Sequence, residues 1–520
     1  MHAARATPGF ALARAIGTLH QSSKSGLAWA GKPPASAMGC GASSPAPAAA
    51  APSVPPAATG SEAAPEVATA EVPAVTTSPA DASAADAAPA PAEAVAASKP
   101  PADDASGLDA EADDGATARS IADAAVASAL EVSAETPEAG SDASTAPENS
   151  NAHLEEVLAA DAAEWATLNA AGCAPFAGAQ WTVGFIADQD EASASEAADG
   201  SKLYESTFSL GSLSYDVEAK AYTLGALKHS VVATKRGDKA GRGAEFSALE
   251  VLGARLLTFD DRTGAVDEIV KEGDGFAVQP LLDGAGEEVV CSLGDGSRPG
   301  KGLKCEWATL RDGALVVGST GKERTDDEGN IVHEGEMWCK AINPETLAVT
   351  SVDARPLYNA LRAKAKCPQG KGYMIHESGR WSDVHLRWFF MPRKLSREPY
   401  DEVRDASKCV SLLLAAKGDG AEATCIARSL EPALSFLPLR GASDFFFIPN
   451  TNDTHLFITR TEETLDNAVT TFASVIDLAG NVLMAEQEIA RGCKFEGACV
   501  LDGWLSGEAS EAPACTCQVM

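Results

Sequence analysis

Basic residues are scarce in this sequence. Its 520 residues include 41 Lys and Arg against 74 Asp and Glu, which gives a formal net charge of −33. Proteins that bind nucleic acid usually present a basic surface with interleaved aromatic side chains, and the sequence contains no such patch. The composition therefore argues against a nucleic-acid partner and is more typical of a protein that binds cations.

Long apolar runs and metal-type cysteine spacings are also missing. No stretch is long and apolar enough to span a bilayer. The twelve cysteines are scattered, Cys515 and Cys517 lack metal spacing, and no Cys/His cluster has the spacing of a zinc site. Cys493 and Cys499 could pair in an oxidising compartment. These absences exclude a membrane-spanning helix and a zinc site of the usual kind.

Aromatic residues are almost absent from the first third of the chain. Residues 42–149 are mostly Ala, Pro, Ser, Asp and Glu and cannot bury enough apolar surface to offset the chain entropy lost on folding. We therefore expect a disordered, acidic, low-complexity region over 38–150. A short connecting segment (151–180), one large folded domain (181–504) and a Cys-containing tail (505–520) follow.

The N-terminus contains a conditional lipidation motif. Residues 1–37 carry four basic residues and no acid, which suggests a basic leader or an untranslated extension. If translation starts at Met38, Gly39 is placed for myristoylation and Cys40 for palmitoylation, and two acyl chains can tether a protein to a membrane. The alternative is an accidental match within a low-complexity segment.

The region after Trp181 alternates apolar and polar residues with period two, which predicts strands joined by turns that contain Gly, Asp and Asn. Residues 357–366 are the best short helix. An oxygen-bearing residue recurs about every 50–70 residues where a new strand set begins, at Ser247, Glu306, Glu377, Ser443 and Glu496. Five such repeats predict an all-β fold, a five-bladed β-propeller.

Equivalent positions on the innermost strands of a propeller converge on its axis. We therefore expect these five residues to surround one cation, and a roomy ring of hard oxygen ligands suits Ca²⁺. Without a cation, crowded carboxylates would raise one another's pKa. Spacing alone also permits the alternative that they are unrelated acids at strand starts.

The matching stretches "IADQD", "GRGAEFS", "DDRTG", "GKGLKCEW", "YNALRA", "HESGRWSDVHLRWFFMPR", "FFFIPNTND" and "KFEG" cover nearly all of 181–497. Together they resemble the soluble calcium-activated nucleotidases of the apyrase family. The resemblance implies a five-bladed propeller with a central Ca²⁺, held by the five residues above. It also implies hydrolysis of nucleoside di- and triphosphates, such as UDP, GDP and ADP, to the monophosphate and phosphate, and a secretory or extracellular location. One position departs, because Ala248 stands where the family has an acid.

Hydrolysis of a phosphoanhydride requires a cation, basic groups on the phosphates and a carboxylate that orients water. We expect Arg393 and Arg262 to clamp phosphate, with Lys394 as a neighbouring charge, and Asp188, Asp190 or Asp261 to position the water. The alternatives are that "DDRTG" is simply a turn and that Arg393 and Lys394 end a solvated strand.

Two other functions stay open at this point. The first alternative to the nucleotidase is a catalytically weakened propeller that binds Ca²⁺ and a ligand, with Ala248 as the mark of decay. The second is a membrane-tethered scaffold whose acidic region is the working part.

Overall fold

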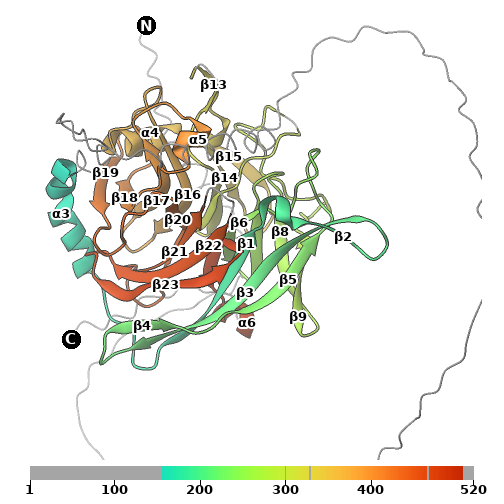
Figure 1. Cartoon of the computed structure of the whole chain (residues 1–520), viewed down its shortest axis with the longest axis horizontal. Coiled ribbons are helices and arrows are strands. Elements are labelled where there is room, and N and C mark those ends of the chain that lie inside the picture. Colours follow the sequence, from blue (N-terminus) through green and yellow to red (C-terminus); the bar gives the residue numbers. More distant parts are fainter. Residues whose placement is uncertain (1–154, 299, 327–328, 465–467, 508–520) are drawn as a thin grey trace, which may run out of the picture. The chain divides into compact units, whose positions relative to one another are not determined.

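The computed structural model describes residues 155–298, 300–326, 329–464 and 468–507. The folded part consists mainly of β-strands, arranged in five sheets around an axis (Figure 1). The predicted five-bladed propeller is therefore confirmed. The leader, the low-complexity region, the lipidation motif at Gly39 and Cys40, and the tail beyond residue 507 lie outside the described residues.

Each blade is an antiparallel sheet whose strands follow one another from the axis outward. Blade 1 contains β24 (Lys494–Val500), β1 (Gln180–Asp188) and β3 (Lys202–Asp216), flanked by β2 (Ala194–Glu196), β4 (Ala221–Leu224) and β5 (Lys228–Thr234). Blade 2 contains β6 (Phe246–Leu252), β7 (Arg255–Asp260), β8 (Val266–Glu272) and β9 (Gly275–Pro280). Blade 3 contains β10 (Trp307–Arg311), β11 (Ala314–Gly318), β14 (Trp338–Ile342) and β15 (Val349–Asp353).

The last two blades follow the same plan. Blade 4 contains β16 (Tyr373–Ser382), β17 (Arg387–Ser396), β18 (Leu412–Lys417) and β19 (Thr424–Ser429). Blade 5 contains β20 (Arg440–Phe447), β21 (His455–Glu463), β22 (Val469–Asp477) and β23 (Val482–Arg491). A small hairpin of β12 (Arg324–Thr325) and β13 (Ile331–His333) extends from blade 3, and α5 (Glu402–Asp405) and α6 (Asp502–Ser506) are short.

The propeller is closed by the end of the chain. Strand β24 pairs with β1 in antiparallel register, with Val183 opposite Val500, and supplies the innermost strand of blade 1. The five innermost strands contact one another around the axis in the order β24, β6, β10, β16, β20 and back to β24. Residues about 50–70 apart in the sequence therefore become neighbours in this ring.

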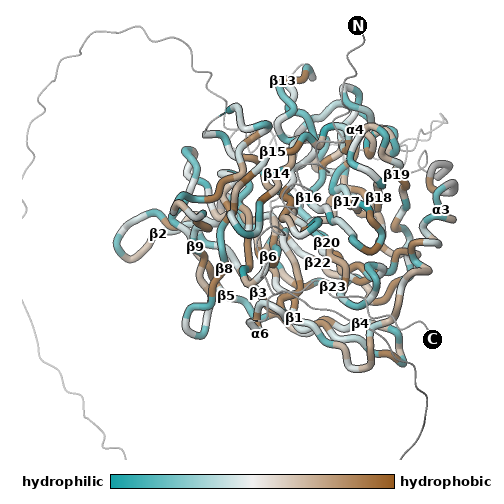
Figure 2. Tube along the Cα trace, turned by 180° about the vertical axis from the view of Figure 1, so that it is seen from behind, coloured by the Kyte–Doolittle hydropathy of each residue, from teal (hydrophilic) through white to brown (hydrophobic). Residues whose placement is uncertain are grey.

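Apolar side chains fill the spaces between blades. Trp307 of blade 3 packs against Trp388 and Phe390 of blade 4, and Phe185 of blade 1 packs against Phe457 of blade 5. Apolar stretches run along the blade strands, and the connecting loops are more hydrophilic (Figure 2). Burial on both faces of each sheet thus holds the blades at fixed positions around the axis.

The expected connecting segment before blade 1 contains helix α3 (Glu155–Ala170), which packs on the outer strand β19 of blade 4. The Trp165 indole donates to the Ala427 carbonyl at 3.1 Å, and the Asp161 carboxylate accepts from the Ala427 amide at 2.7 Å. These contacts satisfy both polar backbone groups of Ala427 on the edge strand. The edge of blade 4 is therefore covered by a segment that precedes the propeller in sequence.

Two further expectations concern helices and cysteines. The predicted short helix is present as α4 (Arg355–Lys364). A pairing of Cys493 with Cys499 is wrong, because both are free. Cys493 directly precedes β24 and Cys499 lies near the far end of that extended strand, about 20 Å away. None of the helices that the structure describes combines the length and apolar character of a membrane span.

Candidate functional site

β-Bulges displace four of the five candidate metal ligands from the regular alternation of their strands. The register of β6 with β7 skips Ser247, that of β16 with β17 skips Glu377, that of β20 with β21 skips Ser443, and that of β24 with β1 skips Glu496. A bulge inserts an unpaired residue and re-aims its side chain. Glu306 directly precedes β10, and its amide donates to the Gly318 carbonyl.

The structure brings the candidate ligands together on the innermost strands. Glu306, Glu377 and Glu496 interact electrostatically with one another, and the Ser443 hydroxyl donates to the Phe495 carbonyl beside Glu496 at 2.9 Å. Ser247 lies on β6, which contacts β24. The three glutamates of the repeat are thus close in space, and the two serines lie on the inner strands that contact β24.

Each axial glutamate is paired with a basic side chain that also binds a second acid. Lys304 joins Glu306 to Asp261, with both contacts at 2.6 Å. Lys494 joins Glu496, at 3.0 Å, to Asp188, at 3.1 Å.

Arg393 completes the pattern in blades 4 and 5. It joins Glu377, at 2.7 Å, to Glu463, at 2.8 Å, and also donates to the Thr461 hydroxyl at 3.0 Å. Three cations therefore separate the glutamates at the axis from an outer set of acids.

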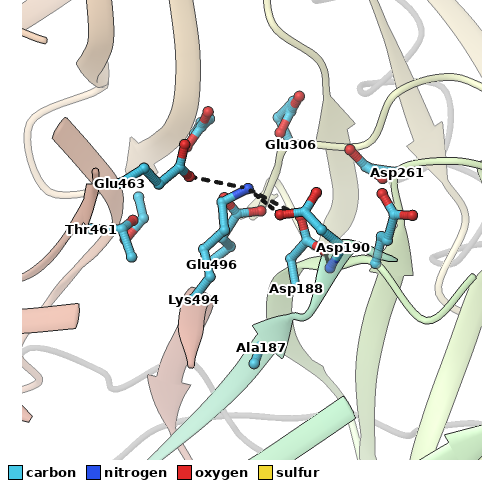
Figure 3. A network of polar contacts seen from close by, with 12 residues as sticks. Ala187, Asp188, Asp190, Asp261, Glu306, Thr461, Glu463, Lys494 and Glu496 are labelled. Carbon is cyan, nitrogen blue, oxygen red and sulfur yellow. Dashed lines mark hydrogen bonds and ion pairs between the residues drawn. The ribbon is translucent and has the colours of Figure 1, made fainter. Parts of the chain in front are cut away.

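Lys494 has the most acidic surroundings of the three cations. Its ammonium group lies 3.4 Å from Glu463 and 3.7 Å from Asp190, in addition to its contacts with Asp188 and Glu496. Figure 3 shows the lysine reaching between Glu463 on one side and Asp188 and Asp190 on the other. The contact between Lys494 and Asp188 joins the first and last strands of the propeller, because Asp188 ends β1 and Lys494 begins β24.

A second cluster of carboxylates lies where β1 ends. Oxygens of Asp188, Asp190 and Glu245 all lie within 4.8 Å of one another. Arg242 neutralises part of this charge, with contacts to Glu245 at 2.7 Å and Asp190 at 2.9 Å. Asp261 is also near, since its charge acts on both Asp188 and Glu245.

Burial is the largest influence on the pKa values of Asp188, Glu245 and Glu306. It raises the pKa of Asp188 to about 7, against the opposing effect of Lys494, and the pKa of Glu245 to about 9, with Asp188 adding to the effect. Burial likewise raises the pKa of Glu306 to about 8, where Lys304 opposes the shift and Glu377 increases it. These three carboxylates therefore hold protons more tightly than free acids do.

The donor set fits a hard divalent cation. It consists of three carboxylates and two serines, and oxygen ligands of this type suit Ca²⁺. The Ser247 hydroxyl and one oxygen of Asp261 are buried and have no hydrogen-bond partner among the described residues. Buried oxygens without partners are costly, and a bound cation or its water ligands would satisfy them.

The residues predicted to bind phosphate or to position water differ in how close they lie to the axial glutamates and the carboxylate cluster. Asp188, Asp190 and Asp261 are part of it, whereas the Arg262 guanidinium is held by Asp238 at 2.8 Å. Lys394 acts on the charge of Glu463, which places it near Arg393. Their proposed roles in catalysis and phosphate binding remain predictions.

The segment "DDRTG" is also a well-formed turn. One oxygen of Asp260 accepts from the amides of Arg262 and Thr263, at 3.0 and 2.7 Å. Gly264 has φ 71°, and a Cβ there would lie 2.2 Å from the Cys291 carbonyl. This turn holds Asp261 and Arg262 at the rim of the site.

Sequence reasoning missed five charged residues of the site: Arg242, Glu245, Lys304, Glu463 and Lys494. A signal was available for some of them. Lys304 and Lys494 each stand two residues before a candidate glutamate, and Glu245 stands two residues before Ser247. Residues two apart in extended backbone can share a face, and the structure pairs Lys304 with Glu306 and Lys494 with Glu496.

The chain is similar in sequence to known proteins of one family. The family described as Apyrase matches residues 189–501. An apyrase of Cimex lectularius is 34% identical over 61% of this chain and 82% of that protein. Soluble calcium-activated nucleotidase 1 of Rattus norvegicus is 38% identical over 49% of this chain and 59% of its own length, and apyrase apy-1 of Caenorhabditis elegans is 34% identical over 49% and 67%. The chain therefore belongs to the apyrase family.

Proposed function

We propose that this protein hydrolyses nucleoside di- and triphosphates to the monophosphate and inorganic phosphate in a calcium-dependent reaction. Family membership supports hydrolysis of nucleotide phosphates, and the names of the rat and mouse relatives supply the link to calcium. The observation that carries the proposal is the pairing of each axial glutamate with a cation that also binds an outer acid.

Calcium would be held by Glu306, Glu377 and Glu496, with Ser247 and Ser443 as further oxygen donors. When bound, it would supply positive charge to the phosphate oxygens. The chain itself supplies basic groups at the same place, since Lys304 and Lys494 each contact an axial glutamate. In the proposed complex these ammonium groups neutralise phosphate charge that the acids around them would otherwise repel.

Asp188 is the best candidate for orienting the attacking water. It ends β1 beside Lys494, and burial raises its pKa to about 7. A general base is most effective when its pKa lies near the working pH. Asp190 differs, because Lys494 lowers its pKa, so it stays ionised and serves better as an electrostatic partner.

Arg393 has a positioning role in this proposal as well as the phosphate contact expected from the sequence. Its guanidinium is buried and binds Glu377, Glu463 and Thr461. Those contacts fix the orientation of the Glu377 carboxylate. A phosphate would have to share the donors of Arg393 with these partners.

The second candidate function is a propeller that binds calcium more weakly, and Ala248 supports it. It is buried on β6 directly after Ser247 and offers no side-chain oxygen. If the family's acid at this position contributes to the metal, this protein binds calcium less tightly or uses a water there. The catalytically weakened propeller is the extreme form of this alternative.

Phosphate release from UDP, GDP and ADP, measured with calcium and with EGTA, tests the proposal. We expect release with calcium and none with EGTA, and Glu377→Gln should require more calcium for the same rate. Hydrolysis that persists in EGTA, or a Glu377→Gln variant with the wild-type calcium requirement, would contradict it. Release that appears only after Ala248→Asp would favour the weakened propeller.

Attachment and location are separate proposals. Acylation at Gly39 and Cys40 would tether the protein to a membrane, whereas the family resemblance favours the secretory pathway. Labelling with a myristate analogue in cells, with expression started at Met1 or at Met38, distinguishes the two. Label on the Met38 product alone supports the tether, and no label on either product excludes it.

A further inference from the structure

Arg380 is a buried cation on the axis that the proposed reaction does not use. It lies on β16, three residues beyond Glu377, and its residue exposure is 5%. Its guanidinium donates to the Phe445 carbonyl at 2.6 Å and to the Ala498 carbonyl at 3.2 Å. It also donates to the Ala308 carbonyl.

Two carboxylates complete the surroundings of this guanidinium. Asp444 accepts with both oxygens, at 3.0 and 2.9 Å, and Glu250 accepts at 2.8 Å. Asp444 is itself fixed, because it also accepts from the Ala498 amide at 2.8 Å. The arginine is therefore held by charge-assisted hydrogen bonds in which its partners are also ordered.

These partners belong to all the other blades. Glu250 lies on β6, Ala308 on β10, Asp444 and Phe445 on β20, and Ala498 on β24. One side chain from β16 thus contacts the innermost strand of every other blade. A planar guanidinium has five N–H donors and can reach acceptors on several strands at once, whereas an ammonium has only three donors.

The acceptors are also of the kind that bind a divalent cation. Two carboxylates and three backbone carbonyls, contributed by four blades, form an oxygen set typical of calcium sites. In this protein the chain's own guanidinium occupies the centre of that set. We propose that Arg380 is a built-in cation that ties the five inner strands together, so that closure of the propeller does not require calcium.

This inference rests on the proposed function in one respect, namely that calcium binds at the ring formed by Glu306, Glu377 and Glu496. It adds that the calcium requirement belongs to the reaction and not to the fold. A propeller whose inner strands were joined only by the glutamate ring would loosen when calcium is removed. With Arg380 in place, the inner strands should stay closed in a chelator.

The test compares thermal unfolding of the full chain in EGTA and in calcium for wild type and Arg380→Met. Wild type should unfold cooperatively in both, with a difference of only a few degrees expected for one bound ion. Arg380→Met leaves Glu250 and Asp444 without their counter-ion, so its melting temperature in EGTA should fall by about 5–10 °C. Calcium should restore more of the melting temperature in this variant than it adds to wild type.

Arg311→Met is the matched control for the loss of a buried arginine. Arg311 pairs with both carboxylate oxygens of Asp419 and stacks over Trp381, and none of these partners is an acceptor of Arg380. It should lower the melting temperature without changing the increment that calcium adds. An equal calcium increment in the two arginine variants would overturn the proposal.

A neutral variant guards against a general folding failure. Glu250→Gln, Arg380→Met and Asp444→Asn together remove the guanidinium and both carboxylates, so no buried charge is left alone. A melting temperature in EGTA equal to that of wild type would show that the tie is dispensable and the proposal wrong. A wild-type protein that unfolds in EGTA would also overturn it, and neither result depends on whether the protein hydrolyses nucleotides.

Discussion

Glu306→Gln should make the calcium-free protein more stable and the enzyme worse. Glu306 is 2% exposed, and burial raises its pKa to about 8 from an ordinary value of 4.5. Glutamine keeps the size of the side chain and removes the charge. The substitution therefore separates the cost of holding a carboxylate at the axis from its use as a calcium ligand.

The magnitude follows from that pKa. Each unit of difference between the folded-state and unfolded-state pKa values corresponds to about 1.4 kcal/mol, so ionised Glu306 destabilises the metal-free fold by roughly 5 kcal/mol above pH 8. The variant also loses the 2.6 Å contact of Lys304 with this carboxylate, although Lys304 keeps Asp261. We expect a net gain of about 1–3 kcal/mol in the free energy of unfolding.

The pH dependence gives the sign of the effect. The unfolded chain releases the Glu306 proton near pH 4.5, whereas the folded chain keeps it up to about pH 8. The stability of wild type relative to the variant therefore falls as the pH rises between these values. The two proteins should be equally stable near pH 4 and differ fully above pH 8.

Urea unfolding in EGTA at pH 4.5, 7 and 8.5 measures this difference, and phosphate release measures the calcium requirement. Glu488→Gln is the control, since Glu488 is on the surface and paired with Arg491, and it should change neither quantity. A Glu306→Gln variant that is less stable than wild type at pH 8.5, or that keeps the wild-type calcium requirement, would refute the reasoning.

Three other substitutions have defined outcomes. Arg393→Ala removes the 2.7 Å partner of Glu377. It should abolish phosphate release at saturating calcium, while calcium still raises the melting temperature of the variant. A wild-type rate of phosphate release would contradict the role assigned to Arg393. Ala248→Asp should lower the calcium concentration that gives half-maximal activity, and an unchanged calcium titration would mean that this position does not contribute. Trp165→Phe removes the donor to the Ala427 carbonyl and should lower the free energy of unfolding by about 1–3 kcal/mol with kcat unchanged. Denaturant unfolding measures the loss of stability, and rate measurements check that kcat is unchanged.

The sequence by itself determined the fold class and the position of the axial ring. Alternation with period two is a local property of each strand, so it can be read without knowing what the strand pairs with. The recurrence of Ser247, Glu306, Glu377, Ser443 and Glu496 gave the number of blades for a similar reason. Each blade repeats one local pattern, and the family motifs fall on the same positions.

Only the tertiary structure decided what surrounds those residues. The link from Lys494 to Asp188 joins residues 306 apart, and that from Arg380 to Glu250 joins residues 130 apart. Such contacts exist because the innermost strands form a closed ring, and no local pattern specifies which charged side chains meet in it. The same holds for α3, whose hydrogen bonds to Ala427 depend on the exposed edge of a blade that follows it by more than two hundred residues.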